Sequence, residues 1–166
     1  MAGSISAVTS SQMNITLPTT DFGVEIPFVK HLGFVLTVFA DGMAEVSYQP
    51  RPEHLNSHSV THGGAVMTLL DVTMAMAARS SVVGLGVVTI EMKTSFMRPS
   101  HGALTARGRL MHHTATLAFT EATVYDTHDK ACAHATGTFK YIKRLPVGHR
   151  NVHPLIVSGN TEESKL

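Results

Sequence analysis

The stretch from Asn56 to Asp71 constrains this chain most, because a polar loop passes through two consecutive glycines into a long apolar segment. From Gly63 to Ala78 the residues are mainly alanine, methionine, leucine and valine, without proline, which predicts a helix that begins at the glycine pair. Asp71 is the only charged residue of this segment, and its helical neighbours are mostly apolar. The stretch therefore predicts a helix that carries a lone carboxylate on a mostly apolar face.

Both parts of this stretch have two interpretations. The first turn of a helix has backbone N–H groups without intrahelical acceptors, and the helix dipole adds partial positive charge there. Gly63 and Gly64 would let a substrate oxygen approach these donors, as in an oxyanion site, or they form an ordinary turn. Asp71 is either a chemically active buried acid or a carboxylate that is hydrogen-bonded to a neighbouring loop.

The spacing between the two groups adds a constraint. Asp71 follows Gly63 by eight residues, which places it about 12 Å further along the helix axis. Its side chain leans back by only a few ångströms, whereas an oxyanion donor must lie roughly 3 Å from the reacting oxygen. If both groups act on one bond, they come from two chains. The sequence then predicts a homodimer with the site at its interface.

Composition limits the class of protein. A chain of 166 residues fits one domain with a real core, and its net charge of +1 gives no field that would recruit nucleic acid. The low charged content of 15% is compatible with a buried oligomer interface. The single cysteine, Cys132, fits a reducing compartment and is expected to pack in the core. Because no long apolar run or basic N-terminal leader is present, we expect a soluble, cytoplasmic protein without a membrane span.

The histidines do not predict a metal site, although there are 11 of them. His58 and His62 are four residues apart, but the glycines after His62 place the pair in a loop rather than on one helical face. No carboxylate or third histidine has a suitable spacing to complete a site. We therefore expect neither a metal ion nor a cofactor.

The remaining elements predict an α+β domain. Residues 21–32 are compatible with a short helix, and strands are expected at 34–40 and 43–48 around an Asp-Gly hairpin turn. Four further strands are expected at 87–96, 104–110, 117–125 and 131–142. A long central helix would then lie on a mainly antiparallel sheet of about six strands. This domain spans 21–143, between a flexible N-terminal segment, 1–20, and a polar C-terminal extension, 144–166.

Alternation within two strands predicts which side chains share a face. In the strand 87–96, one face would carry Val88, Ile90, Met92 and Phe96, and the other Thr89, Glu91, Lys93 and Ser95. In the last strand, one face would carry only small residues: Ala131, Ala133, Ala135 and Gly137. This face either lets a helix or another strand pack closely, or has no such role.

The order of elements, together with Asn56, His58, the His62-Gly63-Gly64 run and an acid at Asp71, resembles the hotdog-fold thioesterases of the PaaI-like (phenylacetate-degradation) group in the acyl-CoA thioesterase superfamily. The resemblance covers roughly residues 32–143. It implies a hotdog fold, in which the sheet wraps the helix. It also implies hydrolysis of an acyl-CoA or a related acyl thioester, without a cofactor, by a homodimer or by a homotetramer built from two dimers.

The resemblance implies catalytic roles for four residues. The Gly63 backbone N–H would polarise the thioester carbonyl and stabilise the oxyanion, and Asp71 of the partner chain would act as general base or as nucleophile. Asn56 would orient water or the thioester, and Thr89 would assist the acid. The residues themselves support Asp71 best, because apolar surroundings raise the pKa of a carboxyl toward the range that suits a base.

The resemblance also implies substrate-binding roles for His62, Gly64 and His58. His62 would shape the loop by hydrogen bonding to the backbone, and His58 would supply a supporting contact. The phosphates of coenzyme A would need basic partners, and the sequence offers several without singling one out: Arg98, Arg107, Arg109, Lys140, Lys143 and Arg144.

Two other functions remain open from the sequence. One is a hotdog module that binds an acyl-CoA without turning it over. The other is an acyl-thioester hydratase or dehydratase, which would pair His58 or His62 with Asp71 across the dimer. The carrier of the acyl group is also open between coenzyme A and a carrier protein.

Overall fold

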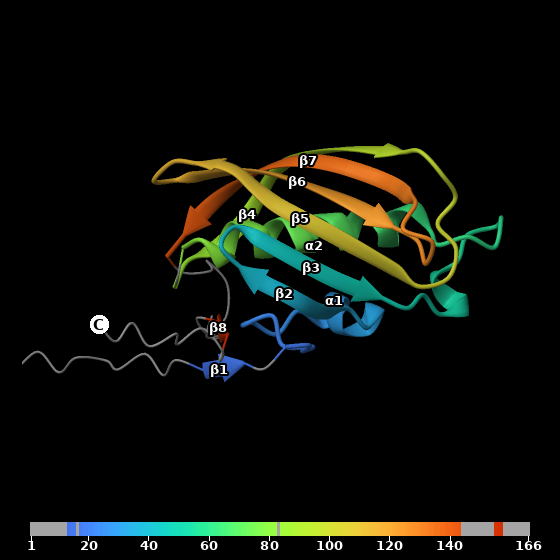
Figure 1. Ribbon diagram of the computed structural model, residues 1–166, viewed down its shortest axis with the longest axis horizontal. Helices are drawn as coiled ribbons and strands as arrows, with labels where there is room; N and C mark the ends of the chain where they lie inside the picture. The colour runs from blue at the N-terminus through green and yellow to red at the C-terminus, as the bar shows by residue number, and fades with distance from the viewer. Residues whose placement is uncertain (1–12, 16, 83, 144–154, 158–166) are drawn as a thin grey trace, which may run out of the picture.

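The computed structural model describes residues 13–15, 17–82, 84–143 and 155–157. Its main body is one long helix, α2 (Gly63–Ser80), packed on a six-stranded sheet (Figure 1). All neighbouring strands of the sheet are antiparallel. Their order is β2 (Val35–Ala40), β3 (Met43–Tyr48), β5 (Leu104–His113), β6 (Leu117–Tyr125), β7 (Ala131–Ile142) and β4 (Gly86–Phe96). The predicted α+β arrangement of a central helix and about six strands is confirmed.

The connections explain how distant segments meet at the helix. Hairpins join β2 to β3, β5 to β6 and β6 to β7, while α2 carries the chain from β3 to β4 at the far edge of the sheet. Two short helices, α1 (Pro27–Leu32) and the 3₁₀ helix η1 (Pro52–His54), flank the first hairpin. Both β2 and β4 are edge strands, and β4 lies close in sequence to the helix that it flanks.

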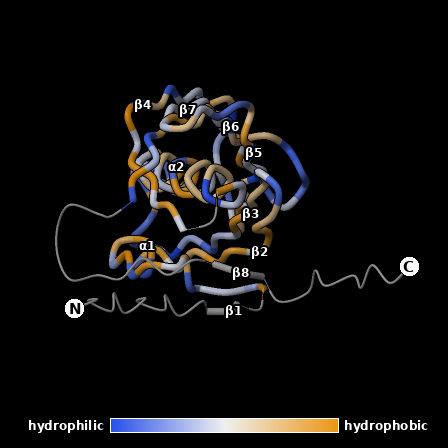
Figure 2. The backbone as a smooth tube through the Cα atoms, turned by 90° about the vertical axis from the view of Figure 1, so that its left-hand side faces the viewer, coloured by the Kyte–Doolittle hydropathy of each residue, from blue (hydrophilic) through white to orange (hydrophobic). Residues whose placement is uncertain are grey.

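The sheet curves around α2, which Figure 2 shows nearly end-on. Where β5 and β7 cross the helix they approach it closely. A side chain at Gly108 would place its Cβ 2.9 Å from Cγ2 of Thr73, and one at Gly137 would lie 3.1 Å from Cε of Met74. The small face of β7 therefore packs against the helix. Met74 and Cys132 are both fully buried in this core.

One face assignment in β4 is wrong. Thr89 pairs with Phe139 and Glu91 pairs with the next residue of β7, Thr138, so Ile90 is an extra residue that forms a β-bulge. Because one inserted residue reverses the alternation, Thr89 shares the inward face with Met92. Val88 and Ile90, predicted to share one face with Met92 and Phe96, are exposed, and Phe96 is exposed as well.

The two ends of the chain meet beside this body. β1 (Met13–Ile15) pairs in parallel with β8 (Leu155–Val157), a pairing that the sequence had not predicted. Most of the predicted flexible segment, 1–20, and of the predicted extension, 144–166, lies outside the described residues. Within the described part, no helix is long and apolar enough to cross a membrane.

Candidate active site

His62 determines how α2 begins. It is the N-cap residue of the helix, and its Nδ1 accepts a hydrogen bond of 2.9 Å from the backbone N–H of Gly64. Since Nδ1 is the acceptor, the ring proton of the neutral imidazole sits on Nε2. The backbone N–H of His62 in turn donates to the carbonyl of buried His54 at 2.8 Å. His62 therefore bonds to the backbone, as the resemblance implied, and it caps the helix in place of the usual Ser, Thr, Asp or Asn.

The N–H of Gly63 is the free donor of this turn. The next three N–H groups of α2 donate to His62, through its ring or its carbonyl oxygen. Among the described residues, no acceptor receives a hydrogen bond from Gly63 N–H. This group lies at the positive end of the helix dipole, so it is available to a negatively charged oxygen.

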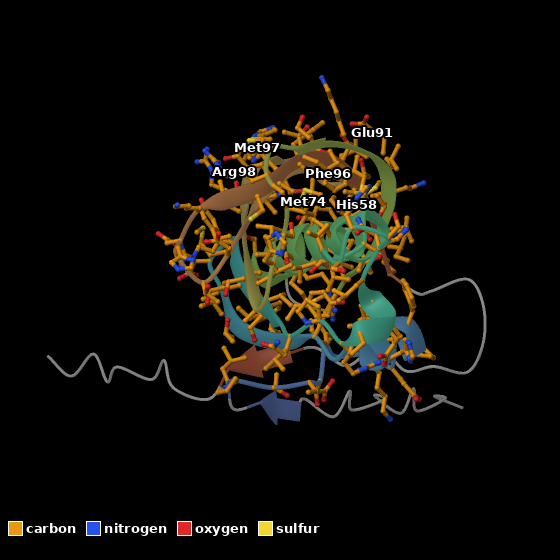
Figure 3. The ribbon with its side chains drawn as sticks, turned by 90° about the vertical axis from the view of Figure 1, so that its right-hand side faces the viewer. His58, Met74, Glu91, Phe96, Met97 and Arg98 are labelled. Carbon is orange, nitrogen blue, oxygen red and sulfur yellow. The ribbon has the colours of Figure 1, made fainter. Side chains whose placement is uncertain are left out.

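Gly63 borders an open groove of about 520 Å³. The ring of Phe96 packs on Gly63, because a Cβ built there would lie 3.4 Å from Cζ of Phe96. At this end of the molecule, which faces the viewer in Figure 3, His58, Phe96, Met97 and Arg98 lie around the start of α2. One side of the groove is formed by residues 96–100. The other side is formed by residues of the loop and the helix start: Asn56, His58, Val60, Thr61, Gly63 and Val66.

Asn56 holds the loop and keeps one group free. Its Oδ1 accepts hydrogen bonds from the backbone N–H groups of His58, at 2.9 Å, and Val60, at 3.4 Å. This turn is typical of asparagine. The side-chain Nδ2 has no partner among the described residues, and Asn56 lines the groove that contains Gly63. The amide N–H groups are therefore available to a bound molecule.

Asp71 forms the second part of the candidate site. Its Oδ1 accepts a hydrogen bond of 2.8 Å from Oγ1 of Thr89 on β4. Burial raises the pKa of the Asp71 carboxyl above its usual range, and the hydrogen bond from Thr89 opposes this rise. The bulge at Ile90 makes the contact possible, because it turns Thr89 toward the helix.

The two parts lie apart within one chain. α2 is continuous from Gly63 to Ser80, so Asp71 stands two turns, about 12 Å, beyond Gly63. The groove at Gly63 is not lined by Asp71. Asp71 instead lies on the least buried stripe of the helix, with Met67, Thr68 and Ala75. A single chain therefore presents a donor and a carboxylate at separate places.

The other predicted residues lie near the start of the helix. His58 is exposed and lines the groove, whereas Gly64 uses its N–H to bind His62. Sequence reasoning missed His54, whose Nδ1 contacts the hydroxyl of Tyr48 at 2.8 Å and whose carbonyl anchors His62. No pattern in the sequence signals that role, since it depends on the packing of η1. Within the described part of the chain, no three histidine, cysteine or acidic side chains are grouped so that they could hold a metal ion.

Comparison with known proteins adds a family relationship. The model of the thioesterase superfamily matches residues 58–133, which include Gly63, Asp71 and Thr89. A curated protein of Saccharolobus solfataricus named "Putative esterase SSO2140" is 31% identical over 107 residues, covering 64% of this chain and 76% of the relative.

Solved structures agree with the fold. The PaaI protein of the Escherichia coli phenylacetic acid degradation operon superposes with a TM-score of 0.67 at 26% identity, covering 71% of this chain and 86% of that one. The protein smu.793 of Streptococcus mutans, solved bound to acetyl-CoA, gives a TM-score of 0.62 at 25% identity, covering 66% and 89%. The central helix and its curved sheet are therefore a hotdog fold shared with thioesterases.

Proposed function

Because the chain belongs to the thioesterase superfamily, which supports thioesterase activity in general, we propose that it hydrolyses an acyl-CoA or a related acyl thioester to a free acid and a thiol. The free N–H of Gly63, at the positive start of α2 and beside an open groove, is the observation that carries the proposal. An amide in this setting suits the oxygen of a thioester carbonyl, where negative charge develops in the transition state.

The residues at the helix start would act on the carbonyl. The Gly63 N–H donates to the carbonyl oxygen, and the free Nδ2 of Asn56, on the same wall, donates to that oxygen or to the attacking water. Since a thiolate leaves readily, an oxyanion donor and a positioned base are sufficient for the reaction. Asp71 removes a proton from water as the new C–O bond forms, and it returns the proton to the thiolate as the C–S bond breaks. If Asp71 attacks the carbonyl itself, an acylated Asp71 detected by mass spectrometry identifies that route.

A second copy of the chain completes the site in this proposal. Gly63 and Asp71 of one chain are too far apart to act on one bond, so the base comes from the partner subunit. Large apolar side chains are exposed both on the stripe of α2 that carries Asp71 and on β4, an edge strand of the sheet. Edge strands of this kind pair readily with another chain. The exposed side chains are Met67, Val88 and Ile90.

The alternatives have less support from the contacts. A hydratase or dehydratase would pair His58 or His62 with Asp71 across the dimer, but Asp71 already bonds to Thr89 and Nδ1 of His62 already caps the helix. A binding module without turnover would have no use for a carboxylate whose pKa is raised by burial. The acetyl-CoA bound to smu.793 supports coenzyme A as the carrier of the acyl group.

Subunit mixing tests the proposal directly. Asp71→Ala subunits would be combined with Gly63→Pro subunits, which lack the N–H donor, and mixed dimers isolated with two affinity tags. Each parent dimer is expected to be inactive on a panel of acyl-CoA substrates. The mixed dimer has one site with an intact Gly63 and an intact Asp71 from different chains, so release of free thiol should return.

Two other results would contradict the proposal. Verified mixed dimers that release no thiol, while wild-type dimers do, would place the two groups in sites that the same chain supplies. A wild-type protein that releases no thiol from any acyl thioester would contradict the proposed reaction itself. If it adds water to an enoyl-CoA instead, it is a hydratase.

A further inference from the structure

Arg98 differs from the other arginines that the structure describes. Arg79 is buried, and Nη1 of its guanidinium donates to the carbonyl oxygen of Phe22 at 2.6 Å. Three exposed arginines each pair with carboxylates at 2.6–3.1 Å. Among the described residues, no carboxylate lies within ion-pair distance of Arg98. The three paired residues are Arg51, Arg107 and Arg109.

The Arg98 side chain makes one hydrogen bond to the described part of the chain. Its Nη1 donates to the carbonyl oxygen of Ala131 at 2.7 Å, and Arg98 as a whole is exposed. An arginine presents five N–H donors in a planar fork that matches the oxygens of a carboxylate or a phosphate. Because the contact with Ala131 restrains the side chain, less conformational freedom is lost when the other donors bind an anion.

The surroundings of Arg98 favour a negatively charged group. Arg98 lines the groove that contains Gly63, and Phe96 and Val66 add apolar surface to its lining. No acidic residue lines the groove, and the imidazole of His58 stands on the facing wall (Figure 3). A molecule in this groove can therefore contact the Gly63 donor, apolar side chains and a cation that no described carboxylate neutralises.

We propose that Arg98 binds an anionic oxygen group of the thioester substrate while the thioester carbonyl lies on Gly63. This inference rests on the proposed function and narrows the substrate class to thioesters that carry a phosphate or a carboxylate away from the reacting carbon. A phosphate would belong to the coenzyme A or phosphopantetheine carrier, and a carboxylate to the far end of the acyl group. Both use the same bidentate, charge-assisted hydrogen bonds.

Steady-state kinetics with matched thioesters test the proposal. Butyryl-CoA and butyryl-N-acetylcysteamine differ in the phosphates, and glutaryl- and butyryl-N-acetylcysteamine differ in the terminal carboxylate. We expect Arg98→Gln to raise KM about tenfold for the substrate that carries the recognised anion, with kcat little changed, since one charge-assisted contact is lost. Arg98→Lys should recover part of the loss, because it keeps the charge but not the fork.

Arg109→Gln is the matched control, because Arg109 is also exposed but pairs with Glu121 and does not line the groove. A KM increase confined to butyryl-CoA identifies a phosphate, and one confined to the glutaryl substrate identifies a carboxylate. Equal KM values for Arg98→Gln and the wild type on all three substrates overturn the proposal.

Binding measurements keep this test separate from the reaction. The dissociation constant of free coenzyme A, measured by calorimetry, does not require turnover. A wild-type protein without hydrolysis contradicts the proposed function. If free coenzyme A then binds wild type and Arg98→Gln equally, or binds neither, the inference about Arg98 also fails. Weaker binding to Arg98→Gln alone supports a phosphate contact whether or not hydrolysis occurs.

Discussion

The start and the middle of α2 carry the two halves of the proposed site, and they are built in different ways. At the start, Asn56 and His62 bind backbone groups two to four residues away. In the middle, the side chain of Asp71 bonds to Thr89, which lies 18 residues further along the chain. The first half is therefore a product of local chain geometry, whereas the second depends on how the sheet packs on the helix.

The two halves are also opposite in electrostatic character. Gly63 offers a free N–H at the positive end of the helix dipole. Asp71 offers a carboxylate that burial makes easier to protonate. In the proposed reaction neither half is sufficient, because one stabilises negative charge and the other accepts a proton. The comparison predicts that damage to either half stops turnover, but by different amounts and with different pH dependence.

Loss of the base should have the largest effect. Asp71→Asn keeps the size of the side chain and removes the proton acceptor, so we expect kcat to fall by about 10²–10⁴-fold, the usual contribution of a general base. Release of free thiol from acyl-CoA substrates measures the effect. Asp129→Asn serves as the control, because Asp129 is exposed, lies on the turn between β6 and β7, and has a positive φ of 56° that asparagine also tolerates. Turnover by Asp71→Asn at the wild-type rate would remove the middle of α2 from the chemistry.

The same variant should not be less stable than the wild type at neutral pH. Because the pKa of Asp71 is raised in the folded protein, the folded state binds this proton more tightly than the unfolded state. The contribution of Asp71 to the free energy of unfolding therefore falls as the pH rises from the ordinary aspartate value through the raised value. Asp71→Asn removes that slope. Thermal unfolding of both proteins across the acidic range checks the sign.

Loss of the oxyanion donor should have the next largest effect. Gly63→Pro deletes the N–H at the first helical position, where proline is favoured. The preceding His62 already has φ −57° and ψ 135°, a conformation that a following proline requires. We expect kcat to fall by about 10²–10³-fold while the helix is retained. Circular dichroism and thiol release measure the two properties.

Gly63→Ala distinguishes the loss of the N–H donor from steric crowding by an added side chain. It keeps the N–H and places a Cβ 3.4 Å from the ring of Phe96, an ordinary contact. Its kcat should therefore stay much closer to that of the wild type than the kcat of Gly63→Pro. Equal losses in the two variants would indicate that crowding at Phe96, not the missing donor, explains the effect.

Removing the support of Asp71 should have a smaller effect. Thr89→Val keeps the shape of the side chain but deletes the hydrogen bond to Asp71, so the pKa of Asp71 should rise further. We expect the acid limb of the kcat/KM profile to move to higher pH. At pH values on the acid side of this limb, kcat/KM of Thr89→Val should be about fivefold lower than that of the wild type, as expected for one hydrogen bond. Thr89→Ser, which keeps the hydroxyl, should retain the wild-type profile; an unshifted limb in Thr89→Val would show that the contact does not tune the base.

The contrast between the two halves also explains what the sequence could predict. The glycine pair, the capping histidine and the asparagine turn act over a few residues, so their types and spacing indicate the helix start. The sheet order is predictable only in outline, because hairpins follow from turns but the position of β4 beside β7 does not. The pairing of β1 with β8 joins opposite ends of the chain, and no local pattern signals it.

The face of Thr89 was predicted wrongly because alternation assumes a regular strand. The extra residue at Ile90 is visible only against the partner residues of β7, Phe139 and Thr138. Arg98 was similarly hard to single out, because its lack of a carboxylate is a property of elements that are distant in sequence. Residue type and spacing suggest the roles proposed for Asp71 and Gly63, but tertiary contacts determine which neighbours surround them.

The smallest expected effect belongs to the cap of α2. His62→Ala removes the acceptor of the Gly64 N–H, so we expect the free energy of unfolding to fall by about 1 kcal/mol and the melting temperature by about 2–4 °C. Because the Gly63 N–H remains, kcat should change less than in Gly63→Pro. His62→Asn restores a short acceptor at the N-cap and should recover most of the stability. If kcat in His62→Ala instead falls as far as in Gly63→Pro while stability is unchanged, His62 acts on the substrate, and the helix start is more than a locally folded donor.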